Sequence, residues 1–396
     1  MSRYHSYINS SEEIISLYKG EEPFPSFLKK YFSSHKKSGS RDRKSISHLC
    51  YCYFRLGKTA TDLTIEERIL AGLFLCSDQP NEVLAALKPE WNHKVQLVLE
   101  EKLLIINYSP KEHLRRVIIT EVFPWKDELS NGIVHEEFCK SFFIQPNVFL
   151  RVRPGKISTV INKLQAAKIG FRIVGEETLA VPGGLKLEGV LAPDKDVVIQ
   201  DLNSQRTGDF IKSSTGSREP EITVWDCCAG SGGKSIMAYD INPKIDLTVS
   251  DVRESILVNL RKRFQSAGIK KYKSFIVDLT SGKPEIQNPG AEIIICDAPC
   301  TGSGTWSRTP EQLYFFKEPG IERYSALQKK IVSNVIPRLQ KGGSLIYITC
   351  SVFRKENEEI VGFIEQNFPL QLKIMEVLKG YDKKADSMFV AVFGKL

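Results

Sequence analysis

Two cysteines each follow a predicted buried strand. Cys300 lies in the stretch CDAPCTGSG (296–304), just after the apolar run 292–295, and Cys350 follows the apolar run LIYIT (345–349). The thiolate is the nucleophilic form of cysteine, and nucleophilic catalysis proceeds through a covalent intermediate. Two thiols at two strand ends therefore predict a reaction in which a covalent bond is formed and then released.

Methylation of carbon-5 of cytosine requires such a set of groups. Carbon-5 becomes nucleophilic only after a thiolate adds to carbon-6, and the ring can then attack a sulfonium methyl group. An acid near nitrogen-3 assists as negative charge develops, and a second group serves the release step. Cys350, Asp297 and Cys300 fill this list. All six histidines lie at or before residue 135, so Ser-His and Cys-His schemes are excluded unless the N-terminal part contributes.

The elements that position these residues form a predicted doubly wound α/β sheet. Apolar, β-branched runs alternate with helical segments from residue 221 onward, as in parallel sheets that are covered on both faces. The predicted helices are 253–268 and 322–341, and the runs 372–379 and 387–394 would complete the sheet as a hairpin. The predicted strands are 221–226, 245–251, 273–278, 292–297 and 344–349.

A cofactor pocket is predicted where these strands end. The first strand leads into the glycine-rich turn 226–235, and the next three end at Asp251, Asp278 and Asp297. Ligands of open α/β sheets bind at the carboxyl ends of the strands, where Asp251 is placed to accept both hydroxyls of a ribose. Each aspartate could instead cap the following helix, but four successive strand ends favour the pocket. The turn matches neither a phosphate loop nor GxGxxG, and the acids favour S-adenosylmethionine over NAD.

Residues 1–215 carry no comparable chemistry. Residues 1–140 are predicted to be helical, with a capping box at Thr64 and Glu67. The basic segment 27–45 is interpreted as a solvated loop rather than a phosphate-contacting arm. Its basic residues are Lys29, Lys30, Lys36, Lys37, Arg41, Arg43 and Lys44.

Residues 141–215 predict a small α+β domain. Its strands are 148–154, 171–175 and 188–193, and its helix is 157–170. A basic sheet face suits RNA, although composition alone indicates a packing domain equally well. The basic residues are Arg151, Arg153, Lys156, Lys163, Lys168 and Arg172.

Composition limits the classes of partner. The 396 residues carry a net charge of +8, a modest excess that is compatible with nucleic acid. No apolar stretch reaches the roughly 20 residues of a membrane span, and the first residues lack a secretory leader. We therefore expect a cytoplasmic, monomeric protein with reduced thiols and no membrane partner. No CxxC pair occurs, and His48, Cys50 and Cys52 lack zinc-site spacing, so no metal site is predicted.

Four motifs together resemble the Sun/Fmu family of RNA (cytosine-5) methyltransferases. They are CCAGSGGK (227–234), VSD (249–251), CDAPCTGSG (296–304) and YITCS (347–351). The resemblance implies that Cys350 attacks cytosine, that Cys300 aids product release, and that Lys234 and Asp297 reach towards the base. It also implies a pocket for S-adenosylmethionine that is formed by Cys228, Ala229, Gly230, Ser231, Gly232, Gly233, Lys234, Asp251, Asp278 and Asp297.

The resemblance extends upstream and implies three domains. Residues 150–156 and 198–205 resemble the beginning and end of the family's small RNA-recognition-like domain, and 42–57 is similar to its NusB-like helical domain. We therefore expect a NusB-like domain (1–140), an RNA-recognition-like domain (141–215) and a Rossmann-like catalytic domain (216–396). The NusB-like segment favours small-subunit ribosomal RNA over transfer RNA as substrate.

Two departures and several alternatives accompany this resemblance. Gly230 and Ser231 replace an Ala-Pro pair, and Ile256 stands where many relatives have arginine. Both changes affect the expected cofactor affinity rather than the reacting groups. The alternatives are a transfer-RNA methyltransferase, a catalytically silent RNA-binding assembly factor, a methyltransferase for protein or small molecules, and an NAD-dependent oxidoreductase. A methyltransferase for protein or small molecules leaves the paired thiols unexplained, and the pattern of the glycine-rich turn disfavours the NAD-dependent oxidoreductase.

Overall fold

The computed structural model describes residues 3–36, 39–108, 117–185, 187–215, 221–288 and 290–396. The chain divides into two compact units. The helical unit comprises Met1–Asp127, Val134–Gln145 and Trp306–Lys317, and the sheet unit comprises Glu128–Ile133, Pro146–Thr305 and Glu318–Leu396. The segment Trp306–Lys317 therefore belongs to the helical unit, although in the sequence it lies inside the predicted catalytic domain. No helix among the described residues is long and apolar enough to cross a bilayer.

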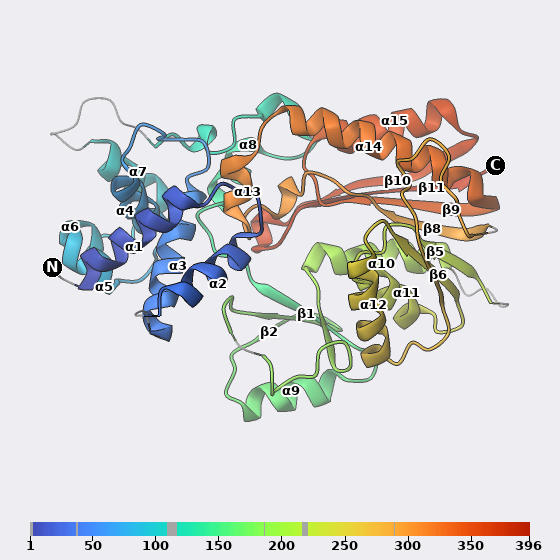
Figure 1. The fold of residues 1–396 in the computed structure, drawn as a ribbon, viewed down its shortest axis with the longest axis horizontal. Coiled ribbons are helices and arrows are strands. Elements are labelled where there is room, and N and C mark those ends of the chain that lie inside the picture. Colours follow the sequence, from blue (N-terminus) through green and yellow to red (C-terminus); the bar gives the residue numbers. More distant parts are fainter. Residues whose placement is uncertain (1–2, 37–38, 109–116, 186, 216–220, 289) are drawn as a thin grey trace. The chain divides into compact units, whose positions relative to one another are not determined.

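The helical unit is built from short helices around an aromatic-rich core (Figure 1). The predicted capping box is confirmed, because Thr64 Oγ1 accepts a hydrogen bond from the Glu67 backbone N–H (3.2 Å) and the Glu67 carboxylate accepts one from the Thr64 N–H (2.8 Å). The helices are α1 (Arg3–Leu17), α2 (Phe24–Ser34), α3 (Ser40–Arg55), α4 (Ile65–Cys76), α5 (Glu82–Leu87), α6 (Pro89–Asn92), α7 (Leu99–Asn107), α8 (His135–Ser141) and α13 (Pro310–Phe315).

The predicted loop at 27–45 is wrong. Most of this segment forms the end of α2 and the start of α3. The apolar residues Phe24, Leu28 and Tyr31 recur at helical spacing and are buried, a periodicity that the interspersed charges obscure. Lys30 pairs with Glu22 at 2.8 Å and Arg41 pairs with Glu82 at 2.7 Å. Lys37 lies outside the described residues.

A small four-stranded antiparallel sheet opens the sheet unit, in the order β2-β3-β1-β4 with α9 (Ile157–Ala166) packed on it. The predicted strand at 188–193 is wrong: a left-handed φ of +83° at Gly189 and the missing N–H of Pro193 favour a turn there. The sequence analysis also missed β3 and β4. The strands are β1 (Val148–Val152), β2 (Arg172–Gly175), β3 (Thr178–Val181) and β4 (Val197–Ile199).

The predicted α/β sheet and its C-terminal hairpin are confirmed. Seven strands lie in the order β10-β11-β9-β8-β5-β6-β7. The pairs from β9 to β7 are parallel, and β11 runs antiparallel to both β9 and β10. The strands are β5 (Thr223–Asp226), β6 (Asp246–Asp251), β7 (Lys273–Ile276), β8 (Ala291–Asp297), β9 (Leu339–Thr349), β10 (Leu370–Leu378) and β11 (Met388–Lys395).

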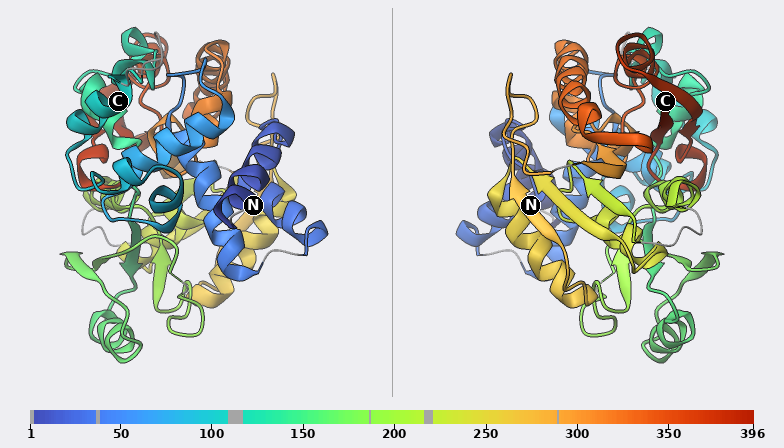
Figure 2. Two further views of the ribbon diagram at one scale, coloured as in Figure 1. Left: turned by 90° about the vertical axis from the view of Figure 1, so that its left-hand side faces the viewer. Right: turned by 90° about the vertical axis from the view of Figure 1, so that its right-hand side faces the viewer.

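Helices cover both faces of this sheet (Figures 1 and 2). One apolar core joins it to α10 (Leu202–Thr215), α11 (Gly233–Ile241) and α12 (Glu254–Ala267), and another to α14 (Pro319–Val335) and α15 (Glu358–Asn367). The chain runs outward from β5 to β7 and then returns to β8 and β9 on the other side of β5. The strand order thus reverses between β5 and β8, and ligands of such sheets bind at this switch point.

Two predicted boundaries change. The helix expected at 322–341 ends at Val335, since Pro337 cannot continue it, and β9 begins at Leu339. The boundary at residue 216 lies outside the described residues. The small sheet has its own core but is grouped with the large sheet in one unit, so the division into three domains stays a prediction.

Candidate active site

The two predicted cysteines lie side by side. Cys300 and Cys350 follow the neighbouring strands β8 and β9, and their Sγ atoms are 3.4 Å apart. Both side chains are half-buried. The hydrogen bond to Cys350 and burial raise the pKa of the Cys300 thiol well above its usual range. Cys300 therefore stays protonated near neutral pH and can donate a hydrogen bond to the Cys350 sulfur.

The backbone around Cys350 is held by a close approach of two loops. Gly304 donates its N–H to the Cys350 carbonyl (2.9 Å) and accepts a hydrogen bond from the Ser387 N–H (3.0 Å). A Cβ at position 304 would lie 2.0 Å from the Ser387 carbonyl oxygen, so only glycine fits between these segments.

Lys234 and Asp297 form an ion pair at the switch point. The Lys234 Nζ, near the start of α11, lies 3.1 Å from Asp297 Oδ2 at the end of β8. The same ammonium group donates to Ser204 Oγ at 2.8 Å. The Lys234 side chain is buried, whereas that of Asp297 is 32% exposed. The two residues that the resemblance places near the base thus lie together, with the carboxylate on the accessible side.

A cavity of about 600 Å³ opens at the ends of the central strands. Its size is typical of sites for small organic ligands, and apolar side chains such as Leu279 and Ile331 share its wall with carboxylates. Acids beside apolar surface suit a cationic nucleoside better than a pyrophosphate. The predicted site residues that line the cavity are Cys228, Asp251, Asp278, Asp297 and Cys300.

The two outer acids make different contacts. The buried Asp251 accepts hydrogen bonds from the Gly230 N–H (3.0 Å) and from the Arg253 N–H (3.0 Å) and Nε (3.2 Å). Asp278 is exposed and accepts from the N–H and hydroxyl of Thr280, which lower its pKa. Asp278 therefore caps a turn, and no helix follows it directly. Asp251 instead ties the glycine-rich turn to β6.

The rest of the predicted cofactor turn supports the cavity from behind. The Ala229 N–H donates to the Ser250 carbonyl (2.9 Å), and Ser231 accepts from Arg263 of α12 through its hydroxyl (2.9 Å) and its carbonyl (3.0 Å). Gly232 has a left-handed φ of +86°, and a Cβ there would lie 2.7 Å from the Phe264 ring. Gly233 begins α11. Ser231 thus faces α12, and the turn packs closely on that helix.

The sequence analysis missed a buried carboxylate that joins the two cysteine loops. Glu356 is fully buried. Its Oε1 accepts from the hydroxyls of Thr301 and Ser351, both at 2.6 Å. Its Oε2 accepts from the Thr301 N–H (2.9 Å) and Gln328 Nε2 (3.1 Å). Because Thr301 and Ser351 directly follow Cys300 and Cys350, Glu356 fixes both thiols relative to each other.

Asn357 extends this cluster on the other side of Cys350. Its Oδ1 accepts from the Thr349 hydroxyl (2.6 Å), and its Nδ2 donates to the Ser351 carbonyl (2.9 Å). Cys350 is therefore bracketed by two anchored neighbours. In the sequence, the two anchoring residues appear simply as an acid followed by an amide, Glu356-Asn357, after a strand end. This pair does not indicate which residues they would contact.

Three of the basic residues predicted to face RNA are engaged inside the fold. Arg151 and Arg153 both pair with Asp240, at 2.5 and 2.8 Å, with side chains that are almost fully buried. Lys163 pairs with Asp196 at 2.5 Å. The prediction of a basic face is wrong for Arg151 and Arg153, because buried ion pairs hold them, whereas the Lys163 side chain stays 41% exposed. Those that remain exposed are Lys156, Lys168 and Arg172.

The buried carboxyl group of Asp226 should make the stability of the folded protein depend on pH. Burial raises the pKa of Asp226 to about 7; Ser235 donates to its Oδ2 (2.6 Å), and its Oδ1 has no hydrogen-bond partner among the described residues. Between pH 4 and 7 the unfolded chain releases this proton while the folded chain keeps it, so stability falls as pH rises through this window and levels off above it.

We expect Asp226→Asn to flatten this profile. Between pH 5 and pH 8, the free energy of unfolding of the wild type should fall by on the order of a few kcal/mol through Asp226. This fall should be absent from the variant. Denaturant titrations at the two pH values measure the difference. The same pH dependence in variant and wild type would contradict the assignment.

The chain is similar to known methyltransferases. Residues 214–387 match the family model described as 16S rRNA methyltransferase RsmB/F. The probable ribosomal RNA small subunit methyltransferase B of Bacillus subtilis is 26% identical over 59% of this chain and 52% of its own length. Ribosomal RNA small subunit methyltransferase B of Salmonella paratyphi A is 29% identical over 44% of this chain and 39% of its own. The chain thus spans about half or less of the length of these relatives.

Solved structures share the fold. The crystal structure of PH0851 superposes with a TM-score of 0.73 at 20% identity and covers 100% of both chains. NSun6 from Pyrococcus horikoshii, solved with SFG, has a TM-score of 0.55 at 16% identity and covers 66% of this chain and 94% of its own. The resemblance inferred from the motifs is therefore confirmed for residues 214–387, which match the RsmB/F methyltransferase family and so indicate a domain that uses S-adenosylmethionine.

Proposed function

We propose that this protein methylates carbon-5 of cytosine in RNA, with small-subunit ribosomal RNA as its substrate and S-adenosylmethionine as methyl donor. The observation that carries the proposal is the pair of thiols 3.4 Å apart at the edge of the cavity. Methyl transfer to nitrogen or oxygen needs no covalent adduct and leaves this pair unexplained. The names of the curated relatives support ribosomal RNA over transfer RNA.

The two cysteines divide the covalent chemistry. The Cys350 thiol loses its proton to solvent and its sulfur forms a bond to carbon-6. The C5–C6 π electrons shift towards carbon-4 and nitrogen-3, where the Lys234–Asp297 pair offers a proton or hydrogen bond. Bound S-adenosylmethionine supplies an electrophilic methyl group, which carbon-5 takes. Solvent water then takes the carbon-5 proton, the electrons of that C–H bond restore the C5–C6 double bond, and the S–C6 bond breaks to release the Cys350 thiolate. The Cys300 thiol stabilises the departing thiolate by hydrogen bonding.

We expect Asp251 to bind the ribose of the cofactor. Asp251→Ala should raise the Kd for S-adenosylmethionine by about 100-fold, because it removes two charged hydrogen bonds of about 1.5 kcal/mol each and frees the Gly230 N–H. Isothermal titration calorimetry measures the change. Asp278→Ala is the matched control, with a smaller effect because that carboxylate is exposed and water competes for its hydrogen bonds. An unchanged Kd for Asp251→Ala would contradict the assignment.

We also propose that the exposed basic residues Lys156, Lys168 and Arg172 contact RNA phosphates. Their combined replacement by alanine should weaken RNA binding and reduce the slope of log K against log salt by about 2, since each phosphate contact contributes roughly 0.7–0.9. Filter binding at several salt concentrations gives the slope. An unchanged slope would place the RNA elsewhere on the protein.

The substrate is tested with transcripts. Small-subunit ribosomal RNA and a transfer-RNA pool are incubated with the protein and methyl-labelled S-adenosylmethionine, and the RNA is digested to nucleosides. The proposal expects labelled 5-methylcytidine from the ribosomal transcript. Label in transfer RNA alone would support the transfer-RNA alternative, and RNA binding without label would support a silent assembly factor.

A further inference from the structure

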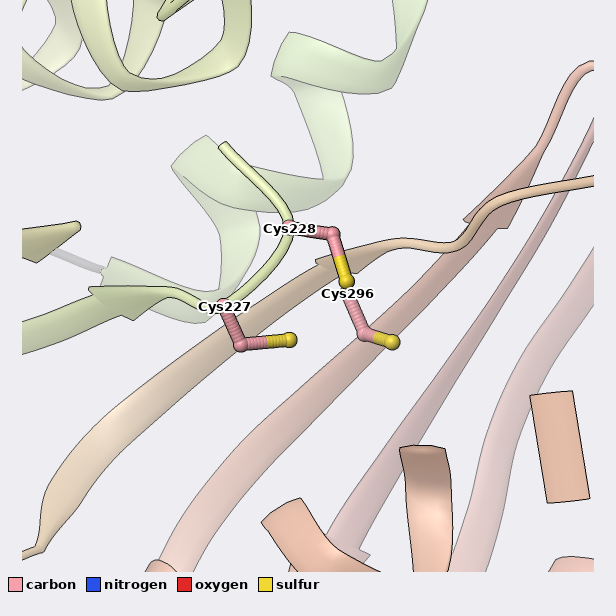
Figure 3. A group of neighbouring side chains, drawn as sticks. All are labelled: Cys227, Cys228 and Cys296. Atoms are coloured by element: carbon pink, nitrogen blue, oxygen red, sulfur yellow. The ribbon is translucent and has the colours of Figure 1, made fainter. Parts of the chain in front are cut away.

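Three other thiols form a cluster beside the cofactor cavity. Cys227 and Cys228 follow β5, Cys296 lies within β8, and their sulfur atoms are all within 4.8 Å of one another (Figure 3). The Cys227 N–H donates to the Ile295 carbonyl (3.0 Å), which continues the parallel pairing of β5 with β8. The backbone of the sheet therefore holds Cys227 beside Cys296, so that the grouping does not depend on a mobile loop.

The cluster has a closed side and an open side. Cys227 and Cys296 are 1% and 0% exposed and lie in the apolar core beneath α14 and α15. Cys228 is only partly buried, and both Cys228 and Cys227 line the cofactor cavity. The proposed methyl transfer uses none of these sulfur atoms as a reacting group. A ligand that prefers sulfur could reach the cluster from the cavity and be shielded from solvent on its other sides.

We propose that Cys227, Cys228 and Cys296 bind a zinc ion through three thiolates, with the fourth coordination position facing the cavity. Thiolate ligands select zinc over magnesium and calcium, which take oxygen. Zinc–sulfur bonds of about 2.3 Å place the sulfurs of a tetrahedral site about 3.8 Å apart. The sulfur–sulfur distances in the structure are at most 4.8 Å. Small side-chain rotations shorten them to about 3.8 Å. Water or a solute in the cavity would occupy the open position, as in zinc sites with three protein ligands.

The test must separate this cluster from the Cys300–Cys350 pair, which also offers two sulfurs. The full-length Cys300→Ser/Cys350→Ser double variant is therefore the background. It is titrated anaerobically with Co²⁺, and thiolate-to-cobalt charge-transfer absorption is followed before the ion is displaced with Zn²⁺. We expect one equivalent to bind. Absence of a charge-transfer band in this background would overturn the proposal.

Further substitutions locate the site. Adding Cys296→Ser, or separately Cys228→Ser, should lower the apparent zinc affinity by at least about 100-fold, since disturbing even the outer partners of a metal site costs 10–100-fold. Adding Cys139→Ser, which removes a buried thiol of the helical unit, should change nothing. Thermal unfolding verifies that each variant is folded, and the partly exposed Cys228 keeps the test valid if Cys296→Ser does not fold. Zinc affinity that survives the loss of Cys228 would overturn the proposal. No step of the test depends on methyltransferase activity.

Discussion

Replacement of Cys350 by alanine should abolish both 5-methylcytidine and any covalent protein–RNA adduct. We expect kcat to fall by more than about 10⁴-fold, the size of effect seen when a catalytic nucleophile is removed. Cys300→Ala should behave in the opposite way: addition and methyl transfer proceed, but the adduct persists because the departing Cys350 sulfur has lost its neighbour at 3.4 Å. Denaturing gels with labelled S-adenosylmethionine and total RNA show both outcomes.

Two variants control this experiment. Cys300→Ser retains a hydroxyl donor and should release more product than Cys300→Ala, and Cys139→Ser should behave as the wild type because it lies in the helical unit. Methylation of cytosine by Cys350→Ala would show that the nucleophile is misassigned. An adduct in Cys350→Ala but not in Cys300→Ala would show that the two roles are exchanged.

Loss of the Glu356 carboxylate should have the second-largest effect. Glu356→Ala leaves the Thr301 N–H, two hydroxyls and the Gln328 amide without their acceptor in a buried site. We expect the free energy of unfolding to fall by about 3 kcal/mol, since one buried unsatisfied group costs about 1–3 kcal/mol. We also expect kcat to fall by about 100-fold, because a displacement of about 1 Å in reacting groups has this consequence.

The kinetic pattern separates positioning from simple destabilisation. Glu356 touches neither cofactor nor base, so the KM for S-adenosylmethionine should stay near that of the wild type while kcat falls. Glu356→Gln keeps one oxygen acceptor for the hydroxyls of Thr301 and Ser351 and should recover part of kcat. Glu311→Gln alters a buried glutamate of the helical unit and should leave kcat unchanged. Equal kcat in Glu356→Ala and wild type below the unfolding temperature would contradict the positioning role.

The grouping of the proposed reacting residues could be predicted from the sequence because parallel strands bring their carboxyl ends to one edge. Each of the residues Cys300, Cys350 and Asp297 follows or ends an apolar run that reads as a buried strand, and β8 and β9 are neighbours. The positions of these residues at predicted strand ends therefore indicated that they lie together in the folded protein. The capping box at Thr64 was predictable for a simpler reason, since both of its partners lie within one helical turn.

Features that depend on pairing across the fold could not be predicted. From the sequence, Arg151 was expected at the surface. In the structure it forms a buried ion pair with Asp240, which lies far along the chain. The partners of Glu356 come from α14 and from two loops. Cys296 joins Cys227 and Cys228 only because β8 returns beside β5. Metal sites are recognised in a sequence by pairs of ligands at short, regular spacings. Cys296 is far along the chain from Cys227 and Cys228, so this cluster could not be recognised in that way.

The most direct test of the account is to identify the sulfur that bonds to cytosine. Wild-type protein is incubated with S-adenosylmethionine and RNA that contains 5-fluorocytidine, in which the group at carbon-5 cannot leave as a proton and the adduct cannot be resolved. The complex is then digested with protease and nuclease, and the modified peptide is sequenced by mass spectrometry. The account predicts a methylated fluorocytidine on Cys350. The same nucleotide on Cys300, or wild-type protein that methylates ordinary RNA at cytosine yet yields no adduct with this RNA, would contradict it.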